Sequence, residues 1–194
     1  CRHAHTDGHL RIGEVYLSDG QLVCGSCGSV VYELYNDRRC GALFFKAYVS
    51  AERFNFRDSS YLWRYTGLIL EPRMKEIHLY IPPKEFQLKN DSGRHPLIPC
   101  YLDTKSGFLH FKDDSYDGKE GYRKLYCCNF SAKGRPQIIT FPTCPHCLHQ
   151  LSQLQLTSFS TRGNPSFFNL IKTQFEAEPP VAGKENQPSR FPNE

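Results

Sequence analysis

Two Cys-x-x-Cys pairs, far apart in the sequence, constrain the fold of this chain more than any other feature. The first occupies residues 24–27 (Cys-Gly-Ser-Cys) and the second residues 144–147 (Cys-Pro-His-Cys). Zinc takes four ligands in a tetrahedron, and each Cys-x-x-Cys turn presents two sulfurs to one ion. The spacing therefore predicts one structural Zn²⁺ site formed by four thiolates, from Cys24, Cys27, Cys144 and Cys147.

The long segment between the pairs must fold into a compact unit that returns the second pair to the first, so the metal is expected to clamp a whole domain. The alternatives are buried reduced thiols, a disulfide, or a redox Cys-x-x-Cys motif. A redox motif normally opens a helix in a βαβ unit, and neither pair has that context. A catalytic zinc would leave one coordination position open for water, which four thiolates do not.

Other cysteines and histidines supply further candidate ligands. Cys127 and Cys128 are adjacent on a predicted strand, so their side chains point to opposite faces and at most one can reach the metal. Either Cys128 or Cys40 is the reserve ligand if one of the pairs does not contribute. A second metal ion at the N-terminus is a further alternative to simple solvated imidazoles, with Cys1, His3, His5 and His9 as its ligands.

Short apolar or alternating runs separated by turn residues predict a mostly β fold. Aromatic residues are abundant, with 14 Phe and 11 Tyr, and aromatic and β-branched side chains fit a pleated, half-buried surface. Turn residues such as Asp-Gly, Asn-Asp and Pro-Pro lie between the runs. The predicted strands are residues 10–17, 21–24, 29–35, 42–49, 61–70, 76–81, 97–102, 108–111, 122–130 and 136–141.

Three segments are expected along the chain. Residues 8–160 form a zinc-clamped antiparallel β domain, either an OB-like barrel or a β-tent. Residues 161–177 form a linker and a short helix, with Phe168, Ile171 and Phe175 on one side of that helix. Residues 178–194 are Pro-rich and polar, and are expected to be disordered. Because the sequence starts with Cys1 rather than Met, we expect it to be a piece of a longer protein.

Cysteine usage and hydropathy bear on the compartment. Nine cysteines is an odd number, and four of them form metal-type pairs, which favours a reducing compartment. This predicts a nuclear or cytoplasmic location. No apolar run approaches the roughly 20 residues needed to span a bilayer, so no membrane partner is expected.

Aromatic residues are interleaved with basic residues in three stretches, residues 44–46, 53–57 and 61–65, which suggests a single-stranded nucleic acid as ligand. Bases stack on aromatic rings while Arg pairs with phosphates. The competing interpretation is a sheet with one face in the core and the other solvated. A net charge of +4 is too small to decide between them. The candidate nucleic-acid-binding residues are Arg53, Arg57, Trp63 and Arg64.

The triplet Lys184-Glu185-Asn186 matches the KEN degron that the anaphase-promoting ubiquitin ligase binds, and it lies in the predicted disordered tail. That ligase is therefore a candidate partner. No phosphate-binding Gly loop, nucleophilic Ser elbow or His-Glu-x-x-His motif is present, so the chain is not expected to be an enzyme.

The split Cys-x-x-Cys pairs, with the Leu-rich residues 148–156 after the second pair, resemble the C-terminal region of protection-of-telomeres proteins. In that family a domain is inserted between the two halves of a zinc-bound OB-fold. The Yippee/Mis18/cereblon-type β-tent is similar in joining two Cys-x-x-Cys hairpins through one zinc. These resemblances imply a non-catalytic zinc-stabilised binding module, for single-stranded nucleic acid in genome maintenance. The alternative is a protein-interaction or substrate-recognition module in ubiquitin and cell-cycle machinery.

Overall fold

The computed structural model describes residues 12–16, 20–64, 73–87, 96–111, 113–151 and 156–158, and within them the fold is mostly antiparallel β sheet. One short 3-10 turn, η1 (Asp114–Tyr116), interrupts the strands. The strands are β1 (Glu33–Asp37), β2 (Leu43–Ser50), β3 (Ser60–Tyr61), β4 (Met74–Ile81), β5 (Leu97–Asp103), β6 (Phe108–Phe111), β7 (Tyr122–Cys128), β8 (Ser131–Ala132), β9 (Arg135–Ile139) and β10 (Leu156–Ser158).

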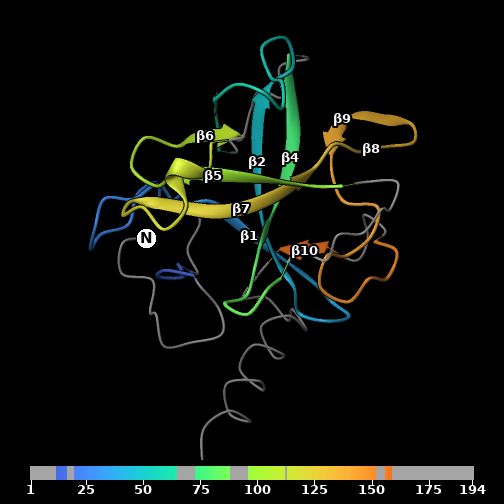
Figure 1. Cartoon of the computed structure of the whole chain (residues 1–194), viewed down its shortest axis with the longest axis horizontal. Coiled ribbons are helices and arrows are strands. Elements are labelled where there is room, and N and C mark those ends of the chain that lie inside the picture. The colour runs from blue at the N-terminus through green and yellow to red at the C-terminus, as the bar shows by residue number, and fades with distance from the viewer. Residues whose placement is uncertain are drawn as a thin grey trace, which may run out of the picture.

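The strands form one path in the order β10-β1-β2-β4-β7-β5-β6-β3. This path consists of two layers, because β4 and β7 pair at a single position, Tyr80 with Tyr126. Figure 1 shows β5 and β7 crossing β2 and β4. The longest ladders lie within the layers, between β2 and β4 and between β5 and β7. The one parallel pairing joins β4 to β9, which in turn pairs with β8.

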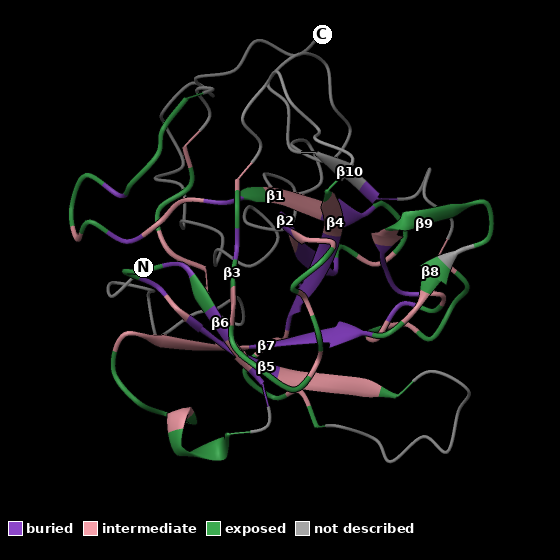
Figure 2. Cartoon of the chain, turned by 90° about the horizontal axis from the view of Figure 1, so that it is seen from above, coloured by how far each residue is buried: buried purple, intermediate pink, exposed green. Residues whose placement is uncertain are grey.

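The main core lies between the two layers, and Figure 2 shows the buried strand segments that enclose it. Side chains alternate across a strand, so Leu43, Ala47 and Val49 of β2 face this core together with Ile77 and Leu79 of β4. The second layer contributes the inward-facing residues Cys100, Leu102, Leu109, Phe111, Leu125 and Cys127.

A second apolar cluster covers the opposite face of β2 and β4. Phe44 and Tyr80 have ring centroids 5.4 Å apart, and Phe141 lies 5.4 Å from Phe44. Cys128 and Cys144 belong to this second cluster, whereas Cys127 belongs to the first. The prediction that adjacent Cys127 and Cys128 face opposite sides is therefore confirmed. The second cluster also places the Cys144 turn directly against the sheet.

Most predicted runs coincide with strands, but the first two do not. Residues 42–49, 76–81, 97–102, 108–111, 122–130 and 136–141 each overlap an observed strand. Within residues 12–16 and 20–30 there is no strand, only a single bridge between Val23 and Val30. The predicted helix and tail, residues 166–175 and 178–194, lie outside the described residues. An antiparallel β domain is confirmed as the fold class.

Lys46, Glu76 and His78 form a partly buried polar network on the outer face of β2 and β4. Glu76 accepts from His78 Nε2 at 2.6 Å and pairs with Lys46 Nζ at 3.4 Å. Burial alone would raise the pKa of Glu76, but hydrogen bonding from His78 and the charges of His78 and Lys46 lower it below its ordinary value. A carboxyl with a lowered pKa stabilises the fold above its unfolded pKa, and this contribution disappears as the pH falls through the folded pKa.

Glu76→Gln is therefore expected to lower the free energy of unfolding by about 2 kcal/mol at pH 7, between the values for exposed and fully buried pairs. The difference from wild type should shrink as the pH falls below about 4.5, where the unfolded carboxyl protonates. Urea unfolding at several pH values measures it. Glu52→Gln is the control, since Glu52 pairs with Arg73 at 3.9 Å with both side chains about 70% exposed. An equal pH-independent loss in both variants would contradict the assignment.

Candidate metal centre

Three turns of identical hydrogen bonding lie on the described chain, at residues 24–28, 37–41 and 144–148. In each, the amide of the fifth residue donates to the carbonyl of the first, at 2.8 Å for Gly28, 2.8 Å for Gly41 and 2.9 Å for Leu148. The amide of the first residue donates to the carbonyl of the sixth, at 2.7, 2.8 and 2.8 Å respectively. The same backbone shape therefore presents a Cys-x-x-Cys pair twice and an Asp-x-x-Cys pair once.

The fifth residue of each turn has a left-handed backbone. Its φ is 68° at Gly28, 73° at Gly41 and 60° at Leu148. Glycine adopts this conformation at no steric cost, which explains Gly at two of the three positions. Leu148 is the one described non-glycine residue with positive φ. Such strain is retained where the surrounding structure over-determines it.

The second and third of these turns meet side by side. Asp37, Cys40, Cys144 and Cys147 place their ligand atoms within 4.8 Å of one another. The sulfurs of Cys40 and Cys144 are 3.6 Å apart. Asp37 Oδ2 lies 3.3 Å from Cys40 Sγ and 3.8 Å from Cys147 Sγ. These four side chains form a group that can hold a metal ion.

The separations within this group match a tetrahedral shell rather than a disulfide. With Zn–S near 2.3 Å and Zn–O near 2.0 Å, tetrahedral ligands lie about 3.8 Å apart for two sulfurs and about 3.5 Å for sulfur and oxygen. The observed sulfur–sulfur distance of 3.6 Å is within about 0.2 Å of the first value, and the sulfur–oxygen distances of 3.3 and 3.8 Å bracket the second. All described cysteines are free thiols, and a disulfide would need about 2.05 Å between sulfurs.

Asp37 is held as a carboxylate at the centre of this group. The residue is 2% exposed, and the backbone amide of Arg39 donates to its Oδ1 at 2.9 Å. Burial would raise the pKa of Asp37, but that amide and the thiols of Cys144, Cys40 and Cys147 lower it below its ordinary value. The Asp37 carboxylate is therefore a buried, negatively charged oxygen ligand that can coordinate a cation.

The net pKa shift of the thiols is opposite to that of Asp37. Burial raises the pKa of Cys144 to about 12, although the amides of Cys147 and His146 partly offset this. Burial also raises the pKa of Cys40 well above its ordinary value, and the nearby Cys144 adds to the rise. A bound dication favours deprotonated ligands and reverses this preference. Metal binding at this group is therefore expected to release protons.

Tyr80 contributes an unsatisfied hydroxyl next to the group. Its Oη is the one buried side-chain polar atom among the described residues without a hydrogen-bond partner. Burial raises the pKa of Tyr80, and the nearby Cys144, Cys40 and Cys147 add to the rise. A buried donor without a partner costs about 1–3 kcal/mol. A metal-bound thiolate is an acceptor of the kind this donor lacks.

The observed group differs from the predicted four-cysteine set. Cys144 and Cys147 belong to it, and so does Cys40, the reserve ligand. Cys24 and Cys27 do not: Cys24 Sγ lies 3.3 Å from Glu14 Oε2, and Cys27 Sγ lies 3.2 Å from Ser29 Oγ. Cys128, the other reserve, packs in the second apolar cluster outside the group. The predicted pairing of the two Cys-x-x-Cys turns through one ion is corrected accordingly.

Asp37 is the ligand that the sequence analysis missed. The signal that could have found it is the stretch Asp37-Arg38-Arg39-Cys40-Gly41, which has the spacing of Cys24-Gly25-Ser26-Cys27-Gly28 with a carboxylate in the first position. A mixed Asp-x-x-Cys turn has the same spacing as a Cys-x-x-Cys turn, but a pattern of paired cysteines does not include it.

The predicted nucleic-acid residues are spread over two places. Arg53 and Arg57 are exposed in the segment that follows β2. Trp63 is 49% exposed just after β3. Arg64 is half-buried and donates to the carbonyl of Leu22 at 2.6 Å. Phe54, between the two arginines, instead packs edge-to-face on Phe111 at 5.8 Å, so it belongs to the core.

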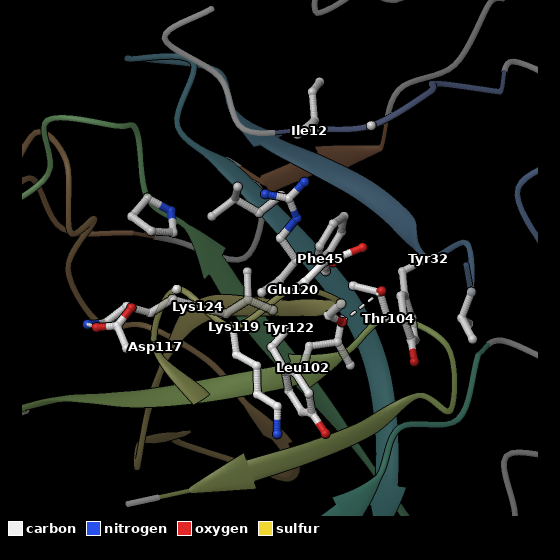
Figure 3. Close-up of a pocket in the computed structure, with 18 residues that line it drawn as sticks. Ile12, Tyr32, Phe45, Leu102, Thr104, Asp117, Lys119, Glu120, Tyr122 and Lys124 are labelled. Carbon is white, nitrogen blue, oxygen red and sulfur yellow. Dashed lines mark hydrogen bonds and ion pairs between the residues drawn. The ribbon is translucent and has the colours of Figure 1, made fainter. Parts of the chain in front are cut away.

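A pocket of about 300 Å³ opens at one end of the main core. Figure 3 shows Phe45 and Leu102 on its wall and the charged residues Lys119 and Glu120 beside it. The hydroxyl of Thr104 donates to the carbonyl of Gly121 at 2.8 Å, so that hydroxyl is already satisfied. We assign no catalytic role to this pocket.

Several predicted features fall outside the described residues. These are the N-terminal Cys1, His3, His5 and His9, and the KEN-like Lys184, Glu185 and Asn186. A second metal ion bound by the N-terminal residues and contact with the anaphase-promoting ligase stay predictions. In the part of the chain that is described, no helix has the length and apolar character of a membrane span.

The chain is similar to one known protein family and to one curated bacterial protein. The model of the YjiV N-terminal domain matches residues 15–160, which include all three turns and every ligand of the metal group. The chain belongs to the YjiV N-terminal domain family. It is also 26% identical over 191 residues to the Druantia protein DruE of Escherichia coli (strain UMEA 4076-1). That match covers 91% of this chain and 9% of DruE. No solved structure is a significant match.

The bacterial relative corrects the predicted location. DruE is an Escherichia coli protein, and bacteria have no nucleus, so the nuclear prediction is wrong. It rested on reduced cysteines, which are equally expected in a bacterial cell interior. Reduced cysteines indicate a reducing compartment, and they are expected in a bacterial cell as well as in a eukaryotic nucleus or cytoplasm.

Loss of the group's ligands is expected to remove the metal and destabilise the fold. Cys40→Ser and Cys144→Ser should each abolish binding at this site. Because metal affinity at a structural site is folding free energy, each should cost roughly 3 kcal/mol or more, which is about 10 °C in Tm at this size. Metal analysis and thermal unfolding by circular dichroism measure both effects.

Cys128→Ala is the matched control. It removes a buried thiol from the same apolar cluster without touching the group, so stability should fall slightly while metal content stays unchanged. If Cys144→Ser retained the metal of the wild type, the assignment of this group would be wrong.

Proposed function

We propose that this chain is a zinc-stabilised, non-enzymatic β module of a larger bacterial protein, and that its ligand is single-stranded nucleic acid. The match to 9% of DruE supports its being one part of a long protein. The observation that carries the ligand assignment is a row of aromatic side chains, in two groups of touching rings, along β3, β6, η1 and β7.

Zinc is the metal that this donor set favours. Three thiolates select zinc over calcium or magnesium, which take oxygen ligands. Four protein donors fill a tetrahedral shell and leave no open position for a reacting water. The ion would therefore act in folding, with Asp37, Cys40, Cys144 and Cys147 as its ligands.

The aromatic row begins at Trp63 and continues along neighbouring strands. The ring centroid of Trp63 is 4.9 Å from that of Tyr61, which is 5.4 Å from that of Phe108. These three side chains are 49%, 38% and 42% exposed. Exposed rings in mutual contact without an apolar cover are the surface on which bases stack.

The row extends from β6 to η1 and β7. His110 follows Phe108 by two residues on β6 and therefore shares its face. The His110 ring lies 4.6 Å from Tyr116, which stacks on Tyr122 at 4.5 Å. We define the aromatic row as Trp63, Tyr61, Phe108, His110, Tyr116 and Tyr122.

Cations accompany these rings. Lys119 Nζ lies 5.3 Å from the centroid of Tyr116 and 5.2 Å from that of Tyr122. Lys124 Nζ lies 5.7 Å from the ring of buried Tyr101 and is paired with Asp117, so Lys119 is the cation that the row offers to a phosphate. Ammonium groups beside stacking platforms can neutralise phosphates, which makes affinity fall with added salt. This pairing of rings with cations supports nucleic acid over an uncharged ligand.

Backbone pairing next to the row supports the OB-like alternative over the β-tent. Trp63 and Tyr48 exchange two hydrogen bonds of 2.8 Å, which link the β3 end of the second layer back to β2. We infer a barrel-like closure in which the aromatic row lies on the outer strand surface. Single-strand binders commonly use such a surface.

Trp63→Ala and Tyr116→Ala are expected to weaken binding of a single-stranded oligonucleotide by about tenfold each, since one stacked base contributes about 1–3 kcal/mol. Lys119→Gln should reduce the slope of log affinity against log salt by about 0.7, the value for one phosphate contact with a single strand. Fluorescence anisotropy at several salt concentrations measures both quantities.

Lys133→Gln is the matched control, because Lys133 is exposed in the turn between β8 and β9, away from the row. It should bind as the wild type does. If the wild type showed no salt-sensitive binding to any single-stranded DNA or RNA, the ligand assignment would fall, and the exposed rings would instead indicate a protein partner.

A further inference from the structure

The Cys24–Cys27 turn has the metal-binding shape but does not take part in the Asp37 group. Its two defining hydrogen bonds, Gly28 to Cys24 and Cys24 to Ser29, match those of the turn at Cys144 within about 0.1 Å. That turn brings its two cysteines into the group of four donors. The same backbone therefore presents Cys24 and Cys27 to a second point in space.

A carboxylate lies against this turn. Glu14 Oε2 is 3.3 Å from Cys24 Sγ, close to the roughly 3.5 Å between sulfur and oxygen ligands of one zinc ion. The other oxygen, Oε1, accepts from the hydroxyl of Ser26, inside the turn. Asp37 stands in the same relation to Cys40, at 3.3 Å from its sulfur. Each place thus brings a carboxylate oxygen to a cysteine sulfur, although among the described residues only the Asp37 group already has all its ligand atoms within 4.8 Å of one another, and Cys27 Sγ contacts Ser29 Oγ instead.

The surroundings of Cys24 are polar, although the residue is only 4% exposed. It belongs to neither apolar cluster of the described residues. Its sulfur instead lies 3.5 Å from the hydroxyl of Tyr16, which also accepts from the amide of Gly25 at 3.0 Å. A structural thiol normally packs among apolar side chains. A thiolate that binds a metal is oriented by hydrogen bonds from neighbouring polar groups.

The local fold supplies a reason for a metal here. Residues 12–16 and 20–30 contain no strand in the described structure, and Val23 to Val30 is a single bridge. Leu22 and Val23 are 58% and 48% exposed, so little apolar burial fixes this segment. Small segments without a sufficient core are commonly held by a metal or a disulfide, and Cys24 and Cys27 are free thiols.

We propose that Glu14, Cys24 and Cys27 bind a second Zn²⁺ ion, separate from the ion at Asp37, Cys40, Cys144 and Cys147. With Glu14, Cys24 and Cys27 as its protein donors, the ion would take water as its fourth ligand. The two ions are independent in this arrangement, since no ligand is shared. The second ion attaches the N-terminal segment to the first turn.

The test is the zinc content of the wild-type chain and of two double variants, purified under reducing conditions. Wild type should contain two zinc ions per chain. Cys24→Ser/Cys27→Ser should contain one and keep the thermal transition of the β domain, whereas Cys40→Ser/Cys144→Ser should lose the other. One ion in the wild type that persists in Cys24→Ser/Cys27→Ser would overturn the proposal.

A milder variant keeps the test independent of folding. Glu14 is exposed, so Glu14→Gln should fold normally while one of the two zinc ions transfers at least tenfold more readily to a chromogenic chelator. Glu33→Gln is the matched control, because Glu33 is an exposed carboxylate that bonds Tyr35 instead of a thiol. Identical zinc transfer from Glu14→Gln, Glu33→Gln and wild type would remove Glu14 from the site.

Discussion

The meeting of the Asp37 turn with the Cys144 turn is the contact on which the rest of the structure depends. It joins residues 104 positions apart in the chain, from Cys40 to Cys144. A link of that separation restricts the unfolded chain strongly, because loop-closure entropy grows with the length of the loop. It also holds Phe141 on the outer face of β2 and β4, where Phe44 and Tyr80 need an apolar cover.

The outer faces of the two crossed layers differ in what covers them. One outer face, on β2 and β4, is covered by the second apolar cluster and the metal group. On the other layer, exposed rings lie on β3 and β6 and just after β3, whereas Tyr101 of β5 and Tyr126 of β7 are buried. Because the layers pair directly only at Tyr80 with Tyr126 and at Tyr48 with Trp63 among the described residues, the main core contributes most of what holds them together. A metal on one face thereby leaves the opposite face available for a ligand.

The sequence predicted the strands better than it predicted which turns lie next to one another in the fold. Strands followed from alternation, and the chemistry of Cys144 and Cys147 followed from their spacing. Which turn lies opposite them depends on strand order, which no local pattern encodes, so Cys24 and Cys27 were assigned to the wrong partner. Asp37 was missed because it stands at the position that a Cys-x-x-Cys pattern gives to cysteine. Trp63 is exposed, whereas Phe54, between Arg53 and Arg57, packs against the main core, and only the tertiary fold makes that difference.

Leu148 shows that the turn at Cys144 keeps its shape at a conformational cost. The equivalent positions of the other two turns are Gly28 and Gly41, which adopt positive φ without steric cost. Leu148 adopts φ of 60° although a left-handed conformation costs an ordinary residue about 1–2 kcal/mol. Its side chain is 59% exposed, so burial does not compensate for that cost. The backbone hydrogen bonds of the turn, from Leu148 to Cys144 and from Cys144 to His149, offset that cost and hold Cys144 and Cys147 against the Asp37 turn.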